Sequence, residues 1–344
     1  MEGGVEKHCE HIYPLLAEHH HLTVFRRRSY VRNNRTYPNI SFKDLPSTRI
    51  KGAEALLHSV LSAIHTIIQK PDVAHIHNIG PALVSPLLKL FSIPIVLTYH
   101  SPNYEHKKWG PVAKSILRLS ERVALKCADR IIFVNRFQME KYSEQVQKKS
   151  EYIPNGIQIP GISQEQDCLE QFGLRDRRYI LSVGRITPEK GFHTLIQAFR
   201  DCGAEDCALV IAGGVEFESG YKKELLKLAE GLPVVFTDYV QGETLRQLYS
   251  HAALYVLASE NEGFPLVLLE AMGYARNVLV SDIPATKLVD LEPGDYFAAG
   301  DHRALAEQMA KKLGENPHRQ YDLSAFTWKE CANHVSRIYG EIGR

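Results

Sequence analysis

The chain has 344 residues, of which 44% are hydrophobic and 24% charged, the composition of an ordinary globular protein. No apolar run approaches the roughly 20 residues that a membrane-spanning helix needs, which argues against an integral membrane protein. At roughly 150 residues per domain, the length predicts two domains. The six cysteines include no CxxC pair, so we expect reduced cytoplasmic thiols with neither a disulfide framework nor a zinc site.

The net charge of +1 conceals an uneven distribution of charge along the chain. Residues 1–150 hold 22 lysines and arginines against 12 acidic residues, whereas the remaining residues hold 19 against 28. A basic first half indicates an anionic partner or membrane surface, and two ordinary solvated surfaces are the alternative. Nucleic acid is not expected as a partner, because the basic residues do not interleave with a known reader motif.

Short apolar runs alternate with amphipathic stretches along almost the whole chain. The apolar runs predict buried parallel strands at residues 21–25, 72–77, 94–100, 130–134, 179–184, 208–214, 234–240, 253–259 and 277–282. Helical periodicity appears between most of them, for example at 113–127, 221–230 and 303–313. This order predicts the α/β class, and the Pro- and Gly-containing segment 152–166 divides it into two doubly wound domains.

Ligands bind such sheets beyond the carboxyl ends of the strands, and VGRITPEKG (183–191) follows one of these ends. Arg185 comes directly after the strand, and Lys190 lies beside Gly191, where a helix over 192–200 is expected to begin. Two cations and a helix amino terminus favour an anion site, most naturally for phosphate, over a solvated basic turn. The segment lacks the spacing of a P-loop.

A second motif, NEGFPLVLLEAMG (261–273), raises the question of what its two acids do. Gly263 allows a tight turn, and Pro265 suits the first position of a helix. The amides of Leu266 and Val267 would then be available to phosphate or ribose oxygens.

Glu262 is expected in the loop before this helix and Glu270 well inside it, among apolar residues. A carboxylate in such surroundings needs hydrogen-bond donors. A sugar diol such as a ribose would supply two hydroxyls, and a buried structural salt bridge is the alternative for each acid.

The third motif is TYHSPNYEHKKWG (98–110), in which His100 stands at a strand end before a loop dense in donors and aromatics. A substrate role for His100 and this loop is favoured over that of a packed histidine. His75 and His77 alternate along another strand, and we expect their imidazoles on opposite faces, which argues against a two-histidine metal site. No metal-ligand spacing and no nucleophile elbow appears.

Taken together, these motifs resemble those of retaining glycosyltransferases of the family 4 type, which have a GT-B fold. The resemblance rests on motifs found in order over nearly the whole chain: GGVE (3–6), DVAHIHN (72–78), TYH (98–100), IPNG (153–156), VGRITPEKG, EGFPLVLLE and the closing FTWKECANHVSRIY (326–339). It implies two Rossmann-like domains, an acceptor domain at 1–157 and a nucleotide-sugar donor domain at 158–344. The last helix, about 328–344, could pack back on the N-terminal domain.

The resemblance also implies roles for individual residues. Arg185 and Lys190 would hold the donor diphosphate and stabilise the leaving group, Glu262 and His100 would contact the donor sugar, and Glu270 would bind the ribose. The other implied donor-binding residues are Gly3, Gly4, Gly184, Val240, Gly263, Phe264, Pro265, Leu266 and Val267. Acceptor contacts would come from Asn103, Tyr104, His106 and Lys107, and neither a metal nor a cofactor is expected.

One feature departs from the family pattern. Family members begin with an apolar strand that leads into the glycine loop, whereas this chain starts at MEGG. We expect that the reading frame starts further upstream, and a trimmed, inactive copy is the alternative. The departure affects Gly3 and Gly4 more than the donor site.

The sequence therefore predicts a hexosyl-type transferase of cell-envelope glycan or glycolipid synthesis. It is expected to be cytoplasmic and peripherally associated with the inner face of an anionic membrane, with Arg26, Arg27 and Arg28 as candidate contacts. A nucleotide-sugar epimerase of the same fold and a degenerate, non-catalytic binding subunit are the alternatives. A nicotinamide dehydrogenase is not expected, because no G-x-G-x-x-G follows a predicted strand.

Overall fold

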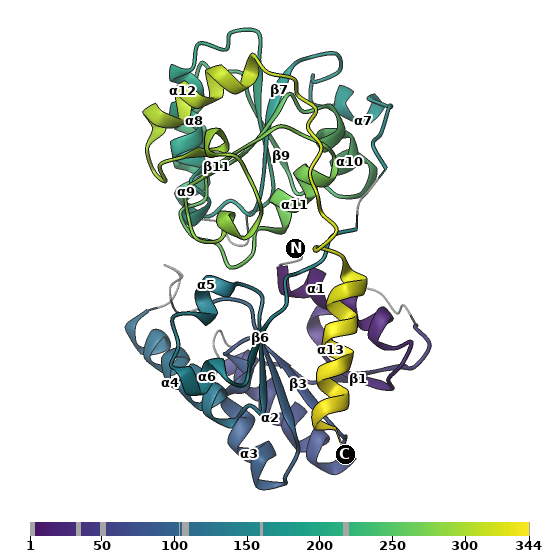
Figure 1. Ribbon diagram of the computed structural model, residues 1–344. Helices are drawn as coiled ribbons and strands as arrows, with labels where there is room; N and C mark the ends of the chain where they lie inside the picture. Colours follow the sequence, from purple (N-terminus) through teal and green to yellow (C-terminus); the bar gives the residue numbers. More distant parts are fainter. Residues whose placement is uncertain are drawn as a thin grey trace. The chain divides into compact units, whose positions relative to one another are not determined.

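The computed structural model describes residues 4–31, 36–48, 53–102, 104, 110–158, 161–215 and 220–343. The chain forms two compact units (Figure 1). The C-terminal unit comprises Ile157–Ser324, and the N-terminal unit comprises Glu2–Gly156 together with Ala325–Arg344. The closing segment of the chain therefore belongs to the unit in which the chain starts. Among the described residues, no helix is long and apolar enough to cross a membrane.

The N-terminal unit contains two parallel sheets. β1 (Leu22–Arg27) pairs with β2 (Ile40–Leu45). The second sheet has the order β3-β4-β5-β6 and is built from Ala74–His77, Ile95–Tyr99, Arg130–Phe133 and Ser150–Tyr152. No strand in the described ranges joins these two sheets.

Helices pack on both faces of the β3–β6 sheet. α2 (Ala53–Gln69), α3 (Ser85–Leu90) and α4 (Pro111–Cys127) share one core with Ile95, Leu97 and Tyr99 of β4. α13 (Trp328–Ile342) packs along α1 (Gly4–Leu16), as Figure 1 shows. The short helices of the unit are η1 (Arg28–Tyr30), η2 (Pro81–Val84), α5 (Arg136–Met139) and α6 (Glu144–Gln147).

Gly156 fits the chain against the start of α13. A Cβ atom at this position would lie 2.2 Å from the backbone nitrogen of Trp328, a distance that only glycine avoids. Thr327 begins the helix by accepting a hydrogen bond from the amide of Glu330 at 3.2 Å, as an N-cap does. The IPNG motif therefore serves local packing within the N-terminal unit.

The C-terminal unit is a six-stranded parallel sheet of order β12-β11-β10-β7-β8-β9. In chain order, its strands β7 to β12 are Tyr179–Val183, Ala208–Ala212, Val234–Asp238, Leu254–Leu257, Val278–Ser281 and Tyr296–Phe297. Its longer helices are α8 (Phe192–Asp201), α9 (Gly220–Leu228), α10 (Gly242–His251), α11 (Leu266–Gly273) and α12 (His302–Leu313), and its short ones are α7 (Asp167–Glu170), η4 (Pro188–Lys190), η5 (Thr286–Leu288) and η6 (Pro293–Asp295).

The direction of winding reverses between β7 and β10 in this sheet. From β7 the chain adds β8 and β9 on one side, and then returns to add β10, β11 and β12 on the other. In doubly wound sheets, ligands bind at such a switch point, beyond the carboxyl ends of the strands. The predicted α/β class with parallel sheets is confirmed, and the switch point indicates where the C-terminal unit can hold a ligand.

Candidate active site

The two charged motifs of the C-terminal unit meet at the switch point. Leu254 and Tyr255 of β10 pair with Ile180 and Leu181 of β7, so the loops that follow these strands are neighbours. The amide of Glu260 in one loop donates a hydrogen bond of 2.9 Å to the carbonyl of Glu189 in the other. Residues that are about seventy positions apart in the sequence therefore face one another.

Lys190 and Glu262 form an ion pair across these two loops. Their side chains are only 15% and 10% exposed, and the hydroxyl of Ser259 also donates to Glu262 at 2.7 Å. Salt and water screen the attraction in such a sheltered pair less than in an exposed one. The attraction therefore fixes the positions of the Lys190 ammonium and the Glu262 carboxylate. The sequence analysis expects both residues in one donor site and leaves a buried salt bridge open as the alternative for Glu262. Without a ligand, Glu262 forms such a salt bridge, and its partner is Lys190.

Two glycines allow the backbone to approach closely beside this pair. Gly191 has φ +65°, and a Cβ atom there would lie 2.0 Å from the carbonyl oxygen of Ala258. At Gly213 a Cβ atom would lie 1.8 Å from the carbonyl oxygen of Gly184. The aliphatic stem of Lys190 passes over Gly184, and Arg185 follows as a half-buried residue. Glycine is therefore required where the neighbouring loops touch the backbone around Arg185 and Lys190.

The start of α11 differs by one residue from the prediction. Helix α11 begins at Leu266, and Pro265 is its N-cap rather than its first residue. The amide of Leu266 donates to the carbonyl of Phe264 at 3.0 Å, so it is not available to a ligand as predicted. Pro265 has ψ +80°, which closes a tight turn before the helix instead of starting it. Val267 is the second helical residue, and its amide is one that no carbonyl of the helix can satisfy.

Glu270 receives its hydrogen bond from a tyrosine. The hydroxyl of Tyr249 on α10 donates to Oε2 of Glu270 at 2.9 Å, and the ring of Tyr249 stacks on Tyr274 with centroids 5.0 Å apart. Burial, and then the nearby Glu270 carboxylate, raise the pKa of Tyr249 well above its usual value, so this hydroxyl remains a donor. The apolar surroundings of Glu270 in the sequence predict that it needs a donor, but no sequence pattern identifies Tyr249 as that donor.

Tyr255 of β10 lies near both acids of the motif. Its side chain is fully buried, and its hydroxyl has no hydrogen-bond partner of normal geometry among the described residues. Burial raises the pKa of Tyr255 well above its usual value, and the charges of Glu270 and Glu262 raise it further. Tyr255 carries a polar hydroxyl inside the apolar run 253–259, and this sequence signal could have identified it as a candidate site residue.

The remaining predicted donor residues of this unit also follow strands. Val240 is half-buried in the turn between β9 and α10, where its backbone is at the carboxyl edge of the sheet. Gly263 and Phe264 are half-buried in the loop between β10 and α11. The predicted donor residues of the C-terminal unit thus lie in the segments that follow β7, β9 and β10, with Glu270 inside α11.

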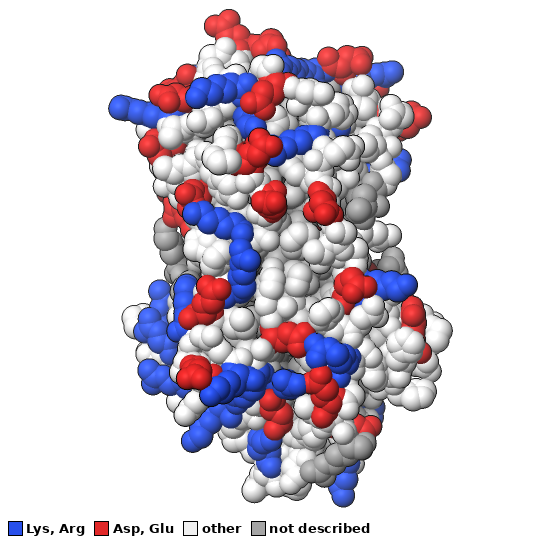
Figure 2. Space-filling model, viewed as in Figure 1, with Lys and Arg blue, Asp and Glu red and all other residues white. Residues whose placement is uncertain are grey.

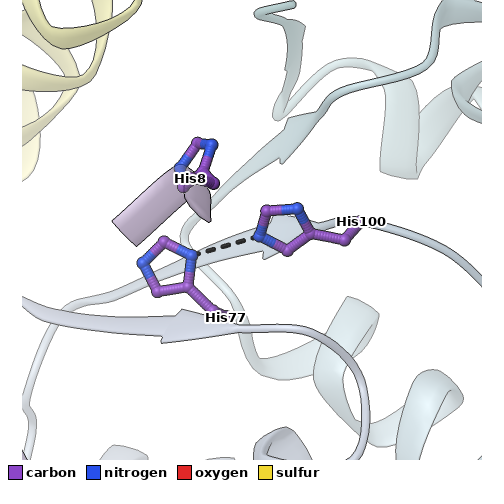
Figure 3. Close-up of side chains that lie close together, drawn as sticks. All are labelled: His8, His77 and His100. Carbon is purple, nitrogen blue, oxygen red and sulfur yellow. Dashed lines mark hydrogen bonds between the residues drawn. The ribbon is translucent and has the colours of Figure 1, made fainter. Parts of the chain in front are cut away.

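In the N-terminal unit, His100 lies in a cluster of histidines (Figure 3). It follows β4, His77 ends β3, and His8 reaches them from α1. A hydrogen bond of 3.2 Å joins Nδ1 of His77 to Nε2 of His100. Burial lowers the pKa of His8 to about 4 and the pKa values of His77 and His100 well below the usual value, so all three imidazoles are neutral at neutral pH.

His75 and His77 lie on the same face of β3, so the prediction of opposite faces is wrong. Their rings stack with centroids 4.3 Å apart. Side chains alternate along a strand with a period of two, which puts residues i and i+2 on one face. Both nitrogens of His75 are hydrogen-bonded, Nδ1 to the hydroxyl of Tyr339 at 2.5 Å and Nε2 to the hydroxyl of Thr98 at 2.7 Å.

The glycine motif and the acceptor loop are only partly described. Gly4 is the exposed first residue of α1. The hydroxyl of Tyr104 donates to Glu121 at 3.3 Å, and this buried carboxylate also accepts hydrogen bonds from Tyr99 and Tyr142. Gly3, Asn103, His106 and Lys107 lie outside the described residues.

Comparison with known families agrees with this arrangement. The family model described as Glycosyltransferase Family 4 matches residues 2–159, and the one described as Glycosyl transferases group 1 matches residues 166–322. The two matched regions correspond to the two α/β units of the chain. The chain belongs to the GT-B glycosyltransferases of the family 4 and group 1 type.

Relatives and solved structures of similar proteins extend over most of the chain. The α-D-kanosaminyltransferase of Streptomyces kanamyceticus is 27% identical over 305 residues, which cover 78% of this chain and 77% of that protein. The sucrose-phosphate synthase of Thermosynechococcus elongatus superimposes with a TM-score of 0.82 at 20% identity, covering 98% of this chain and 93% of the other. HepE of Anabaena in complex with UDP-glucose gives a TM-score of 0.74 at 17% identity, covering 100% and 93%.

Proposed function

We propose that this glycosyltransferase moves a hexosyl residue from a nucleotide-sugar donor to a hydroxyl of a glycan or lipid-linked acceptor, with retention of configuration and without a metal. The observation that carries the proposal is the sheltered Lys190–Glu262 pair at the switch point of the C-terminal unit. In a nucleotide-sugar, the diphosphate and the hexose adjoin. A neighbouring cation and carboxylate suit these two parts, with Lys190 at the diphosphate and Glu262 at the hexose.

In the proposed reaction, Lys190 and Arg185 bind the diphosphate. Lys190 exchanges the carboxylate of Glu262 for phosphate oxygens, and Glu262 then accepts hydrogen bonds from hydroxyls of the donor sugar. The bond between the anomeric carbon and the diphosphate oxygen breaks, and the acceptor oxygen bonds to the same face of that carbon. The acceptor proton passes to the leaving diphosphate, whose charge the two cations stabilise.

The rest of the donor has partners on neighbouring elements. Glu270 binds the ribose hydroxyls, and Tyr249 orients the carboxylate by its hydrogen bond to Oε2. The amide of Val267 faces a phosphate or ribose oxygen, and the backbone at Val240 contacts the base. These contacts lie along one edge of a single sheet, so one extended nucleotide could reach all of them.

The N-terminal unit supplies the remaining contacts of the proposal. His100 is neutral because it is buried, and we propose that it contacts hydroxyls of the donor sugar by hydrogen bonds. The acceptor would be held by the loop that contains Asn103, Tyr104, His106 and Lys107. We propose a cytoplasmic location for the enzyme, where nucleotide-sugar donors are available.

Nucleotide binding tests this proposal directly. The full-length protein is heated with UDP-, GDP- and ADP-sugars, beginning with UDP-glucose, which the similar protein HepE binds. At a concentration one hundred times Kd, a ligand stabilises the fold by about 2.7 kcal/mol, which should raise Tm by roughly 5–10 °C. If no nucleotide-sugar raises Tm, the donor site is wrong. A new sugar nucleotide formed from donor alone would indicate an epimerase.

We also propose that the N-terminal unit docks on an anionic membrane. Ten exposed large hydrophobic side chains lie on the neighbouring helices α2, α3 and α4 or directly after α3: Leu56, Leu57, Val60, Ile64, Ile68, Leu90, Phe91, Val112, Ile116 and Leu119. On α4, the basic residues Arg118, Arg122 and Lys126 are exposed beside them. Figure 2 shows lysines and arginines gathered over the side of this unit that carries α4. An apolar stripe bordered by cations fits an anionic lipid surface.

Two of the arginines near β1, Arg26 and Arg27, are less suitable for membrane contact than the basic residues of α4. Arg26 is paired with Asp44 at 2.7 Å and lies over the ring of Phe42, and Arg27 lies 3.5 Å from Glu54. These counter-ions cancel much of the charge that a lipid headgroup would meet.

Removing exposed cations from α4 should weaken vesicle binding. Arg122→Ala and Lys126→Ala should each lower the affinity for vesicles containing phosphatidylserine about five-fold at low salt, since a basic residue near such a surface contributes about 1 kcal/mol. Arg26→Ala is the matched control and should have a smaller effect. The affinity is measured by vesicle co-sedimentation and should fall as salt rises. Equal binding of all variants, or no binding at low salt, would contradict the proposed surface.

A further inference from the structure

Three histidines from three separate elements of the N-terminal unit converge on one point. His8, His77 and His100 each direct a ring nitrogen into a space where all three nitrogens lie within 4.8 Å of one another (Figure 3). We propose that these three histidines form a binding site for a divalent transition metal ion, with zinc as the preferred class of ligand. The contacts of the three rings carry the proposal.

The spacing within the cluster is already close to that of a metal site. Tetrahedral zinc binds imidazole nitrogens at 2.0–2.1 Å, which sets its ligand atoms about 3.3 Å apart. Nδ1 of His77 and Nε2 of His100 are 3.2 Å apart. Replacing the proton that links them by a metal ion leaves their separation nearly unchanged. His8 has to approach the pair by an adjustment of its side chain on α1.

A hydrogen bond to Asn155 sets the tautomer of His8. Nδ1 of His8 donates to Oδ1 of Asn155 at 2.7 Å, which leaves the lone pair on Nε2. Partners of this kind orient metal-binding histidines and make them more basic. Nε2 of His8 is buried and without a hydrogen-bond partner in the described part of the chain, and so is Nε2 of His77. Buried polar atoms without partners are costly, and a bound metal ion would satisfy Nε2 of His8.

The donor set decides the kind of metal. Among the residues that the structure describes, the cluster contains three imidazoles and no carboxylate, which disfavours magnesium and calcium and suits zinc, copper or nickel. His75 stacks behind His77, but both of its nitrogens are hydrogen-bonded, so it is not a fourth ligand. Three histidines leave one tetrahedral position for water or another small ligand.

Occupancy would have a consequence for catalysis, which rests on the proposed function. If the donor-sugar contact of His100 is made through Nε2, a metal ion on that nitrogen blocks it. Zinc should therefore inhibit transfer, and a chelator should restore it. If zinc binds at the cluster without lowering activity, Nε2 of His100 does not contact the donor sugar, while the metal site stands.

Metal binding itself is measured without any assay of activity. The full-length protein, reduced and stripped with EDTA, is dialysed against zinc, and bound metal is determined by mass spectrometry. We expect stoichiometric zinc, and tetrahedral visible bands when Co²⁺ replaces it. His8→Gln should weaken binding at least ten-fold, and Asn155→Ala about 10- to 100-fold. His11→Gln is the matched control on α1, because its ring stacks on Trp328 outside the cluster, and it should bind as the wild type does.

Two results would overturn the site. One is equal zinc affinity of the wild type and His8→Gln, which would assign the metal to surface histidines. The other is a Co²⁺ spectrum of the wild-type protein with octahedral or thiolate-type bands. This second test does not depend on whether a variant folds.

Discussion

Replacing Lys190 by alanine should lower kcat by about 10²–10³-fold while the fold is retained. Removing one group that stabilises charge developing in a transition state has this magnitude, about 2.7–4 kcal/mol. Lys190 is suited to the role because its ammonium group is sheltered at the switch point and is held by Glu262. The expected result is a loss of turnover larger than the loss of donor affinity, because the charge on the leaving diphosphate increases during the reaction.

The measurement is the release of nucleoside diphosphate from the donor, with water as the acceptor if no glycan is yet known. Lys227→Ala is the matched control, since Lys227 is an exposed lysine of the same unit on α9. Glu262→Gln should lower turnover but keep or improve UDP affinity, because it removes a negative charge from beside the diphosphate. Unchanged turnover in Lys190→Ala, with an unchanged Tm, would remove this residue from the mechanism.

Local periodicity identifies every central strand and three edge strands, β1, β3 and β9. The run at 208–214 is apolar throughout and the run at 179–184 contains Ser182 as its only polar aliphatic residue, because β7 and β8 are covered on both faces. The strands that the sequence analysis does not identify are β2, β6 and β12, each at the end of a sheet. β6 consists of Ser-Glu-Tyr and β12 of only two residues, so neither contains an apolar run that a sequence pattern could detect.

The charged residues of the donor site could be located because they directly follow predicted strands. Their pairing could not, because Lys190 and Glu262 are 72 positions apart and meet only through the adjacency of β7 and β10. Tyr249 was missed for the same reason, since it reaches Glu270 from a different helix.

The histidine cluster is not predicted from the sequence, for one local and one tertiary reason. A period of two applied correctly would have placed His75 and His77 on one face of β3. His8, however, lies 69 positions before His77 in the sequence, and no local pattern brings α1 to the end of β3. Convergence of this kind depends on tertiary packing, which a single sequence does not reveal.

Replacing Glu270 by alanine should raise the Kd for UDP about 10- to 100-fold. A hydrogen bond to a charged group contributes about 1.5–3 kcal/mol, and the proposed ribose contact loses at least one. The kcat at saturating donor should stay near that of the wild type, because the ribose is bound equally in the ground and transition states. Titration calorimetry with UDP gives the Kd, and Glu243→Ala, an exposed acid on α10, is the control.

A deoxyribose analogue of UDP distinguishes a ribose contact from a structural role of Glu270. The wild type should discriminate against 2′- or 3′-deoxy-UDP by a factor that Glu270→Ala largely abolishes, which is the coupling expected of two groups in direct contact. Tyr249→Phe should give an intermediate loss, because the carboxylate remains but loses the hydroxyl that orients it. If Glu270→Ala weakens UDP and deoxy-UDP equally, the carboxylate does not reach the ribose. Glu270 would then have a structural role, as the acceptor of the hydrogen bond from Tyr249.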